Sequence, residues 1–440
     1  MLTDVATAGS GREQRTPPRP PGFAPAGTAA TKAPPFALPG EHFAAALAFL
    51  VLGAAGLVVI APDLANGSYP LPRVVGVAHL FTLGWITTSI MGALYQFLPV
   101  ALGEPIRSVR LAHATFGLYV PGLAAFVAGF VLSASGLMLV GAATFGTGVL
   151  LFAGNLAATL ARSTRRDVTW WALAAAAVFL VVTLVLGLAL AGNLRWDYMG
   201  GGRFTAVGVH LHVAIAGWVL LVVVGVAHRL LPMFLLSHGA GEGLAKAAVA
   251  LLAGGAGALA LSHHGPPLLS RWVPAALIAA GLLCFLAQAR SFYRHRHRPA
   301  LDPGMRLAAA ALGLLGTGVA LAGPVVAGVS SPRLSTAYVL AVVLGISLFV
   351  AAHYYKIVPF LVWYHRFGPL AGKRPVPTVS ELYSTRAAMV AGGLLVLGAV
   401  TLTATVALGW AVLARSAAAL FAAGVGVEAL QMLQLARTRP

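Results

Sequence analysis

The stretch His79-Leu-Phe-Thr-Leu-Gly-Trp85 decides the fold, because its pattern begins again at His212 as His-Val-Ala-Ile-Ala-Gly-Trp. In both copies the histidine is followed at identical offsets by Gly, Trp, a second Gly, an aromatic or imidazole ring, and Pro. A third, degraded copy ends at Pro359 and has Val339 and Gly345 at its histidine and tryptophan positions. Internal repeats predict a fold assembled from related units. The later positions of the two complete copies are Gly84, Trp85, Gly92, Tyr95 and Pro99, and Gly217, Trp218, Gly225, His228 and Pro232.

The composition indicates an integral membrane protein. Hydrophobic residues make up 59% of the 440 residues and charged residues only 9%, whereas a soluble domain has roughly 25% charged residues. The net charge of +18 is explained by Lys and Arg on the cytoplasmic side of a membrane, so we expect no nucleic-acid partner. The single cysteine, Cys284, excludes a disulfide framework and a thiolate cluster. Residues 1–40 are rich in Pro, Ala, Gly and Arg, which predicts a disordered cytoplasmic tail.

Twelve apolar segments are long enough to span a bilayer, because about 20 helical residues cross a ~30 Å hydrocarbon core. Most of the 29 Lys and Arg residues fall on one side when the N-terminus is placed in the cytoplasm, as the positive-inside rule requires. The predicted fold class is an all-α integral membrane bundle with both termini cytoplasmic, in a bacterial inner membrane. The predicted spans are 42–62, 74–100, 111–133, 136–161, 170–192, 204–232, 244–262, 268–290, 305–329, 334–363, 386–407 and 411–436.

The repeated segments fall on the second, sixth and tenth spans, which divides the transmembrane domain, residues 41–437, into three units of four helices. The units cover about residues 41–165, 166–300 and 301–437. Because four is an even number, the units share one orientation, and their pseudo-symmetry axis runs along the membrane normal. The histidine of each complete copy then lies in the outer half of the membrane and the proline near the cytoplasmic face.

Histidines inside membrane spans are costly and indicate function. We expect His79 and His212 to lie at equal depth on neighbouring inner helices, where two neutral imidazoles suit the axial ligation of a haem iron. His210 lies about 200° around the helix from His212 and must face another side, so it is a candidate ligand of a second haem or metal. The alternative is that these histidines only form hydrogen bonds with the backbone of a neighbouring helix.

Other residues of the repeat have two interpretations each. Gly92 and Gly225 allow the close approach of a helix or of a flat macrocycle, and Trp85 and Trp218 either flank a porphyrin or fill the core. Nearer the cytoplasmic face, a second polar set is a candidate proton path or quinol pocket, although interfacial aromatic residues and snorkelling cations are the more common explanation. This set consists of Tyr95, His228, His353, Tyr354, Tyr355 and Lys356.

The sixth span resembles a helix of the haem–copper oxidase subunit I superfamily, in particular of the C-family cytochrome-c oxidases and nitric-oxide reductases. That helix has the pattern His-x-His, Gly-Trp, Gly, Tyr, Pro, which here begins at His210-Leu-His212 and ends at Pro232. The resemblance implies twelve core helices in three arcs. It also implies a low-spin haem held by one histidine of the pair and by a histidine on the second span, a position that His79 matches. The other histidine of the pair would then bind a high-spin haem. The NnrS family of nitric-oxide-response haem and copper proteins is similar in length, helix number and a histidine-rich second span.

The sequence also departs from the oxidase pattern. In the oxidases the His-x-His belongs to the tenth helix, where this chain has Ala337 and Val339. The oxidases bind copper through one histidine of the sixth helix and a His-His pair late in the seventh, and His263 and His264 occupy that place here. His210 or His212 with this pair is therefore a candidate copper site, and a solvated loop at the membrane boundary is the alternative. A complete oxygen-reducing centre is not expected.

These features predict a b-type haem protein with one or two non-covalent haems, because the chain has no Cys-x-x-Cys-His motif. The expected role is electron transfer, or the handling of nitric oxide or oxygen by a haem-dependent oxidoreductase. A cytochrome c or a quinol donor, other membrane subunits and the lipid bilayer are the candidate partners. The alternative is a cofactor-free membrane scaffold or transporter with the same architecture. We expect no acidic side chain inside the spans, which counts against a carrier with a buried carboxylate.

Overall fold

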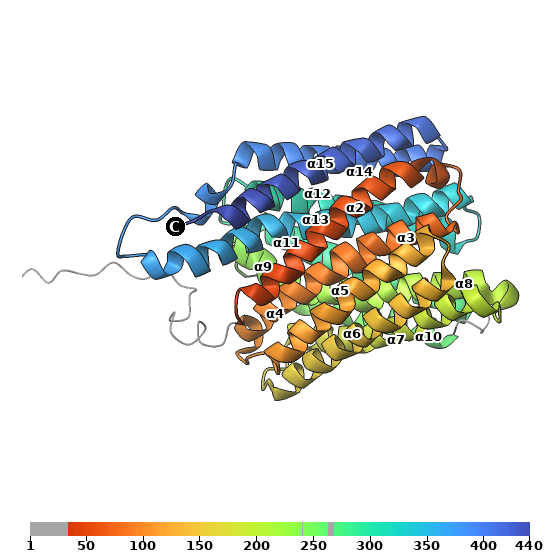
Figure 1. Ribbon diagram of the computed structural model, residues 1–440, viewed down its shortest axis with the longest axis horizontal. Helices are drawn as coiled ribbons and strands as arrows, with labels where there is room; N and C mark the ends of the chain where they lie inside the picture. The colour runs from red at the N-terminus through yellow and green to blue at the C-terminus, as the bar shows by residue number, and fades with distance from the viewer. Residues whose placement is uncertain (1–33, 240, 263–267) are drawn as a thin grey trace, which may run out of the picture.

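The computed structural model describes residues 34–239, 241–262 and 268–440, and within these ranges the chain is helical without any β-strand. The helices run along a common direction (Figure 1). Twelve helical runs among these residues are long and apolar enough to cross a membrane, which confirms the predicted number of spans. In chain order the elements are α2 (Ala37–Ala65), α3 (Pro72–His79), η1 (Leu80–Thr87), α4 (Thr88–Leu102), α5 (Val109–Val131), α6 (Ser135–Arg162), α7 (Val168–Trp196), η2 (Gly200–Gly202), α8 (Arg203–His212), η3 (Val213–Leu220), α9 (Leu221–Leu235), α10 (Gly243–Ser262), η4 (Leu268–Trp272), α11 (Val273–Arg294), α12 (Pro303–Val326), α13 (Pro332–Val362), η5 (Trp363–Phe367), η6 (Gly368–Leu370), η7 (Val379–Leu382), α14 (Thr385–Leu408) and α15 (Ala411–Arg437).

Helix α2 begins earlier than predicted. The expected tail covers residues 1–40, but the helix starts at Ala37. Pro39 lies in its first turn, where a proline removes no intrahelical hydrogen bond. Residues 1–33 lie outside the described residues, so disorder of that part of the tail stays a prediction.

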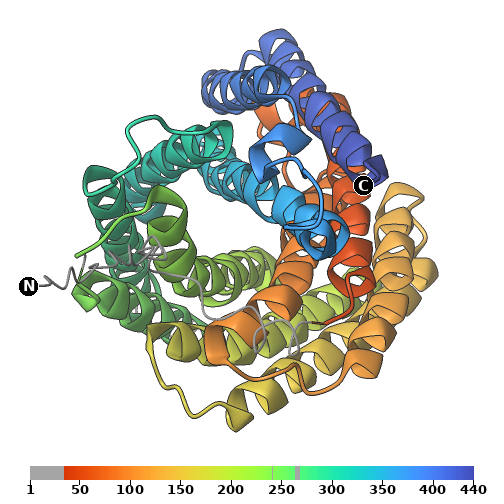
Figure 2. The ribbon, with the colours of Figure 1, turned by 90° about the vertical axis from the view of Figure 1, so that its left-hand side faces the viewer.

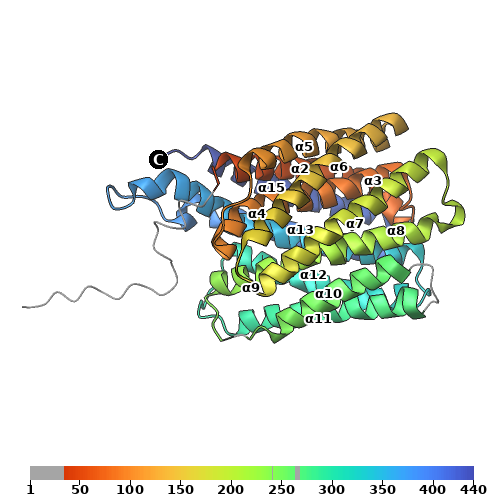
Figure 3. The ribbon, with the colours of Figure 1, turned by 90° about the horizontal axis from the view of Figure 1, so that it is seen from below.

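The second, sixth and tenth spans form the inside of the bundle. Viewed end-on, the helices form a ring (Figure 2), and α15 packs on α2, so the last span lies beside the first. From below, α10 and α11 lie side by side along their length (Figure 3). The share of buried residues in the spans that begin at Pro72, Gly200 and Pro332 is 72%, 67% and 61%, against at most 50% in every other candidate span among the described residues. This agrees with the prediction that the repeated segments lie on inner helices.

Both complete copies of the repeat leave the α-helical hydrogen-bond pattern directly after the histidine. The π-helical stretch η1 follows His79, and the π-helical stretch η3 follows His212. Such stretches are rare in proteins, but those that occur often lie at functional sites. Helix α13, which carries Val339 at the equivalent position, continues as an α-helix. The likeness of the two complete copies therefore extends from sequence to backbone geometry.

The break in η1 is stabilised by hydroxyl groups. The carbonyl of Leu83 accepts a hydrogen bond from the Tyr119 hydroxyl at 2.9 Å and another from the Thr88 hydroxyl at 3.0 Å. Because Tyr119 belongs to α5, this bond also ties the second span to the third. A backbone carbonyl inside a membrane bundle needs such a partner, since lipid offers none.

The glycines of the repeat serve close helix packing. A Cβ atom added to any of them would lie within 2.8 Å of a side chain on the first helix of its own unit, α2 or α7. Small residues at such contacts let two helices approach closely in a membrane. Of the two interpretations, these contacts favour the close approach of a helix over that of a macrocycle. The pairs are Gly84 with Phe49, Gly92 with His42, Gly217 with Phe179, and Gly225 with Ala172.

We predict that Gly141→Ala destabilises the bundle. The added Cβ would lie 2.3 Å from the backbone nitrogen of Phe126, and a backbone atom cannot rotate away. Overpacking of this kind costs roughly 1–3 kcal/mol, so the thermal unfolding midpoint in detergent should fall. Gly154→Ala is the control, because its Cβ would meet nothing within 4 Å among the described residues. Equal midpoints for the two variants would contradict the packing of α5 on α6.

Candidate functional site

His79 lies at the junction of α3 and η1 with its ring beside two phenyl rings of α5. Its Nδ1 donates a hydrogen bond to the carbonyl of Val75 at 2.8 Å, which leaves Nε2 as the acceptor of the neutral ring. The ring centroids of Phe126 and Phe130 lie 5.1 and 6.0 Å from that of His79. The imidazole therefore packs against α5, the third span.

His210, on α8, faces α7. Its Cε1 atom lies 3.0 Å from the position that a Cβ of Gly187 would take, so a residue without a side chain lets the imidazole approach α7. The buried Nδ1 of His210 makes no full hydrogen bond among the described residues, but the imidazole interacts with the backbone of Thr183 on α7. His79 lies within electrostatic range of His210, so imidazoles of the second and sixth spans share one interior region.

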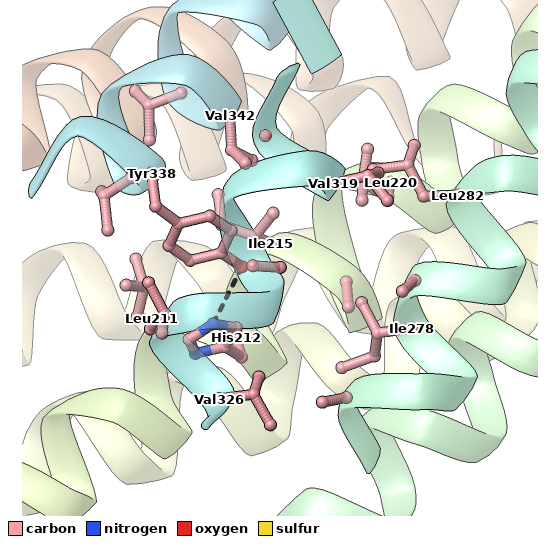
Figure 4. Close-up of a pocket in the computed structure, with 18 residues that line it drawn as sticks. Leu211, His212, Ile215, Leu220, Ile278, Leu282, Val319, Val326, Tyr338 and Val342 are labelled. Atoms are coloured by element: carbon pink, nitrogen blue, oxygen red, sulfur yellow. Dashed lines mark hydrogen bonds between the residues drawn. The ribbon is translucent and has the colours of Figure 1, made fainter. Parts of the chain in front are cut away.

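His212 faces away from His210, toward α13. Its Nδ1 donates to the carbonyl of Gly208 at 2.7 Å, and its Nε2 accepts a hydrogen bond from the Tyr338 hydroxyl at 3.0 Å (Figure 4). The two rings line a cavity of about 80 Å³ whose other walls are apolar and come from the sixth span, α11, α12 and α13.

The histidine of this pair that lies within electrostatic range of His79 is His210, whereas the sequence led us to expect His212 as its partner, so the choice between them stays a prediction. Two residues along a helix correspond to about 200° of rotation, and His210 and His212 do contact different helices, α7 and α13. Which of them turns toward the second span depends on how α8 packs against α7, and a repeat in the sequence carries no information on that rotation.

Trp85 and Trp218 pack between inner helices. The Trp218 Nε1 donates to the Thr87 hydroxyl at 3.2 Å, which joins the sixth span to the second. The Trp85 ring centroid lies 4.7 Å from that of Tyr354 on α13, which joins the second span to the tenth. Both tryptophans are fully buried. These contacts favour core filling over the flanking of a porphyrin.

The polar residues nearer the other end of the bundle do not converge on one pocket. Tyr95 lies beside Phe152 of α6, with ring centroids 5.7 Å apart. His228 lies beside Phe292 of α11 at 6.0 Å, and it lines a separate polar space of about 290 Å³. These contacts show that the residues of the predicted proton path or quinol pocket lie at several separate places in the bundle. The remaining members bond as follows: Tyr354 with Ser89, Tyr355 with Gln431, His353 with the Phe349 carbonyl and Lys356 with Asp302.

The expectation that the spans contain no acidic side chain is wrong. Glu428 lies well inside α15 with an exposed fraction of 0%. Neither oxygen of its carboxyl group has a hydrogen-bond partner among the described residues. The residue is visible in the sequence as a single acidic position within an apolar segment, but its complete burial is not. Tyr338 is also new, since no pattern in the sequence singles out the residue before Val339.

Among the described residues, no group of three or more His, Cys, Asp or Glu side chains is placed to hold a metal ion. His263 and His264 lie outside the described residues, so the candidate copper site stays a prediction. His79 and His210 are too few for a bare zinc or copper ion, which takes three or four protein ligands. Two imidazoles are enough for a metal that brings four ligands of its own, as haem iron does.

No protein-family model matches this sequence, and none of the curated proteins matches it either. The functional argument therefore depends on the geometry of the residues themselves.

We predict that Tyr338→Phe lowers the stability of the bundle. The change removes the hydroxyl that donates to Nε2 of His212, and a buried acceptor left without its donor costs about 1–3 kcal/mol. Thermal unfolding in detergent measures the effect. Tyr69→Phe, which changes a side chain that is 40% exposed, is the control. An unchanged midpoint for Tyr338→Phe would show that the His212–Tyr338 hydrogen bond contributes nothing.

Proposed function

We propose that the protein is a b-type haem protein of a bacterial inner membrane, and that His79 and His210 are the axial ligands of one haem. The twelve spans form three units of four around an axis along the membrane normal. Three interior spaces then lie between successive inner helices: the first between the second and sixth spans, the second between the sixth and tenth, and the third between the tenth and second. Both termini lie in the cytoplasm, at the end of the bundle where α15 finishes, here called the basic end.

The observation that carries this proposal is that two imidazoles of inner helices, His79 and His210, lie within electrostatic range of each other. The hydrogen bond from Nδ1 of His79 to a backbone carbonyl fixes the tautomer and the ring, as it does for many metal-binding histidines. The imidazole of His210 lies against the backbone of Thr183, and its buried Nδ1 lacks a full hydrogen bond among the described residues, so a ligand bound to that ring would satisfy it. Phe126 and Phe130 provide apolar walls. A haem in this place supplies one-electron transfer.

The resemblance to the oxidase superfamily supports the same arrangement. It implies a low-spin haem shared by the second span and one histidine of a His-x-His pair, and we assign that role to His210 because it lies within electrostatic range of His79. A cytochrome c or a quinol is the electron donor under this proposal, and nitric oxide or oxygen the gas handled. The second space, with His212, is the candidate place for a second haem. Tyr338 already bonds Nε2 of His212, so an iron there requires the hydroxyl to move away.

We expect the purified protein to show the reduced-minus-oxidised absorption bands of b-type haem. His79→Ala and His210→Ala should each abolish the bands of the six-coordinate haem, because each removes one axial ligand. His212→Ala should keep them, and so should His228→Ala, the control at the basic end. Loss of the bands in His212→Ala together with their retention in His210→Ala would contradict the assignment. A protein without iron by elemental analysis would refute the haem proposal altogether.

A second candidate function is the binding or transport of a lipid-soluble molecule without a cofactor. The cavity at His212 and Tyr338 favours it, because the walls are apolar and the only polar groups on them are that pair. Helices α11 and α12, which form two of its walls, pack less closely on each other than each packs on its hairpin partner. Their seam is therefore the entrance for a ligand from the bilayer.

This candidate predicts that an apolar molecule with one hydrogen-bonding group co-purifies with the protein. Ala279→Phe, which fills the cavity from α11, should remove the molecule from the preparation, because the phenyl ring takes up part of the space. Ala258→Phe on α10 is the matched control, since Ala258 does not line that cavity. Mass spectrometry of solvent extracts measures the loss. Equal amounts in the two variants, or none in the unchanged protein, would contradict this function.

A further inference from the structure

Glu428 is an unusual residue for a membrane bundle. Of the eleven Asp and Glu residues in the sequence, it is the one that lies in the interior of a predicted span, and it is fully buried. Both carboxyl oxygens lack a hydrogen-bond partner among the described residues. An unpaired carboxylate in such surroundings is so costly that the group takes up a proton instead. An ionisable residue inside a membrane protein is a candidate functional site by default.

Packing does not require a carboxyl group at this position. In the three-unit arrangement, the fourth helix of each unit carries an amide side chain, and the residue three positions earlier is directed to the same side. That residue is Phe152 in the first unit and Phe285 in the second, both buried. A phenyl ring therefore fills the place in two units, and Glu428 replaces it in the third. The three amides are Asn155, Gln288 and Gln431.

The surroundings of Glu428 contain phenolic and hydroxyl groups rather than a cation. Tyr354 and Tyr355 of α13 lie within electrostatic range of its carboxyl group. The Tyr354 hydroxyl shares a hydrogen bond of 2.8 Å with the Ser89 hydroxyl of α4. No charged side chain of the described parts of α2, α4, α13 or α14 acts on Glu428. The carboxyl group can therefore change its charge without breaking an ion pair.

Polar groups connect this region to the basic end. The Tyr355 hydroxyl donates to Oε1 of Gln431 at 2.8 Å, and Nε2 of Gln431 donates to the carbonyl of Ser384 at 2.9 Å. Ser384 is the exposed N-cap of α14. Tyr383 lies beside Tyr355 with ring centroids 5.5 Å apart and the rings tilted by 47°. Burial, and then the Asp302 carboxylate, raise the pKa of Tyr383 to about 12. Its phenol therefore stays neutral at the basic end of these polar groups.

We propose that Glu428 is a proton-binding site in the third interior space, loaded from the basic end along Tyr355 and Gln431. A proton that enters there converts the carboxylate to the neutral acid, and its release along the same route restores the carboxylate. Bridging waters carry the proton between polar groups that are not in direct contact. The proposal is independent of haem binding, because it involves no electron transfer.

Infrared spectroscopy of the protein in lipid discs tests the site, because a protonated carboxyl group has a C=O stretching band distinct from that of a carboxylate. We expect the band at neutral pH in the unchanged protein and its loss in Glu428→Gln. Glu381→Gln, which changes an exposed carboxyl group of η7, should keep it. If Glu428→Gln does not fold, Glu428→Phe, which copies Phe152 and Phe285, should show the same loss in a folded protein. A missing band in the unchanged protein, or its persistence in Glu428→Gln, would overturn the proposal.

Exchange into D2O tests the route. The band should shift when the carboxyl proton is replaced by deuterium, and Tyr355→Phe or Gln431→Leu should slow the shift several-fold. Tyr354→Phe, whose hydroxyl bonds Ser89, should leave the rate unchanged. A band that never shifts would show that the Glu428 proton does not exchange with solvent, which would contradict a proton-binding role. Slowing in Tyr354→Phe, with normal exchange in Tyr355→Phe, would overturn the assigned route.

Discussion

The structure depends on how imidazoles are satisfied in a bundle that offers them no water. Four histidines on inner and outer spans donate Nδ1 to the carbonyl four residues earlier on the same helix, over 2.7 to 2.8 Å. A carbonyl only accepts, so Nδ1 carries the proton and Nε2 keeps the lone pair. Because lipid cannot satisfy that second nitrogen, each Nε2 needs a partner from the bundle or from a ligand. The four are His42, His79, His212 and His353.

The three interior spaces of the proposed arrangement then differ in chemistry although their helices are related. The first holds two imidazoles, His79 and His210. The second holds one, and Tyr338 bonds it beside a small apolar cavity. The third has Val339 in place of a histidine and contains the carboxyl group of Glu428. Under the proposals above, a common scaffold with three different polar centres separates sites for an iron, an apolar ligand and a proton.

The number of spans followed from the sequence, because length and apolarity alone set what crosses a bilayer. The repeat also located the inner helices, since identical offsets fix identical depths. The pairing of the histidines did not follow from it. His210 and His212 differ by about 200° on one helix, and only the contacts with Gly187 on one side and Tyr338 on the other fix which side each takes. The expectation of no acidic side chain in the spans overlooked Glu428, which lies within the predicted span 411–436; its complete burial follows only from how α15 packs.

The most direct test of the central claim is an electron cryo-microscopy map of the protein purified from membranes in haem-replete cells. The account predicts flat density between the imidazole rings of His79 and His210, with Phe126 and Phe130 beside it. Protein side chains filling that region, or the same density placed on His212 with His79 left apart from it, would contradict the account.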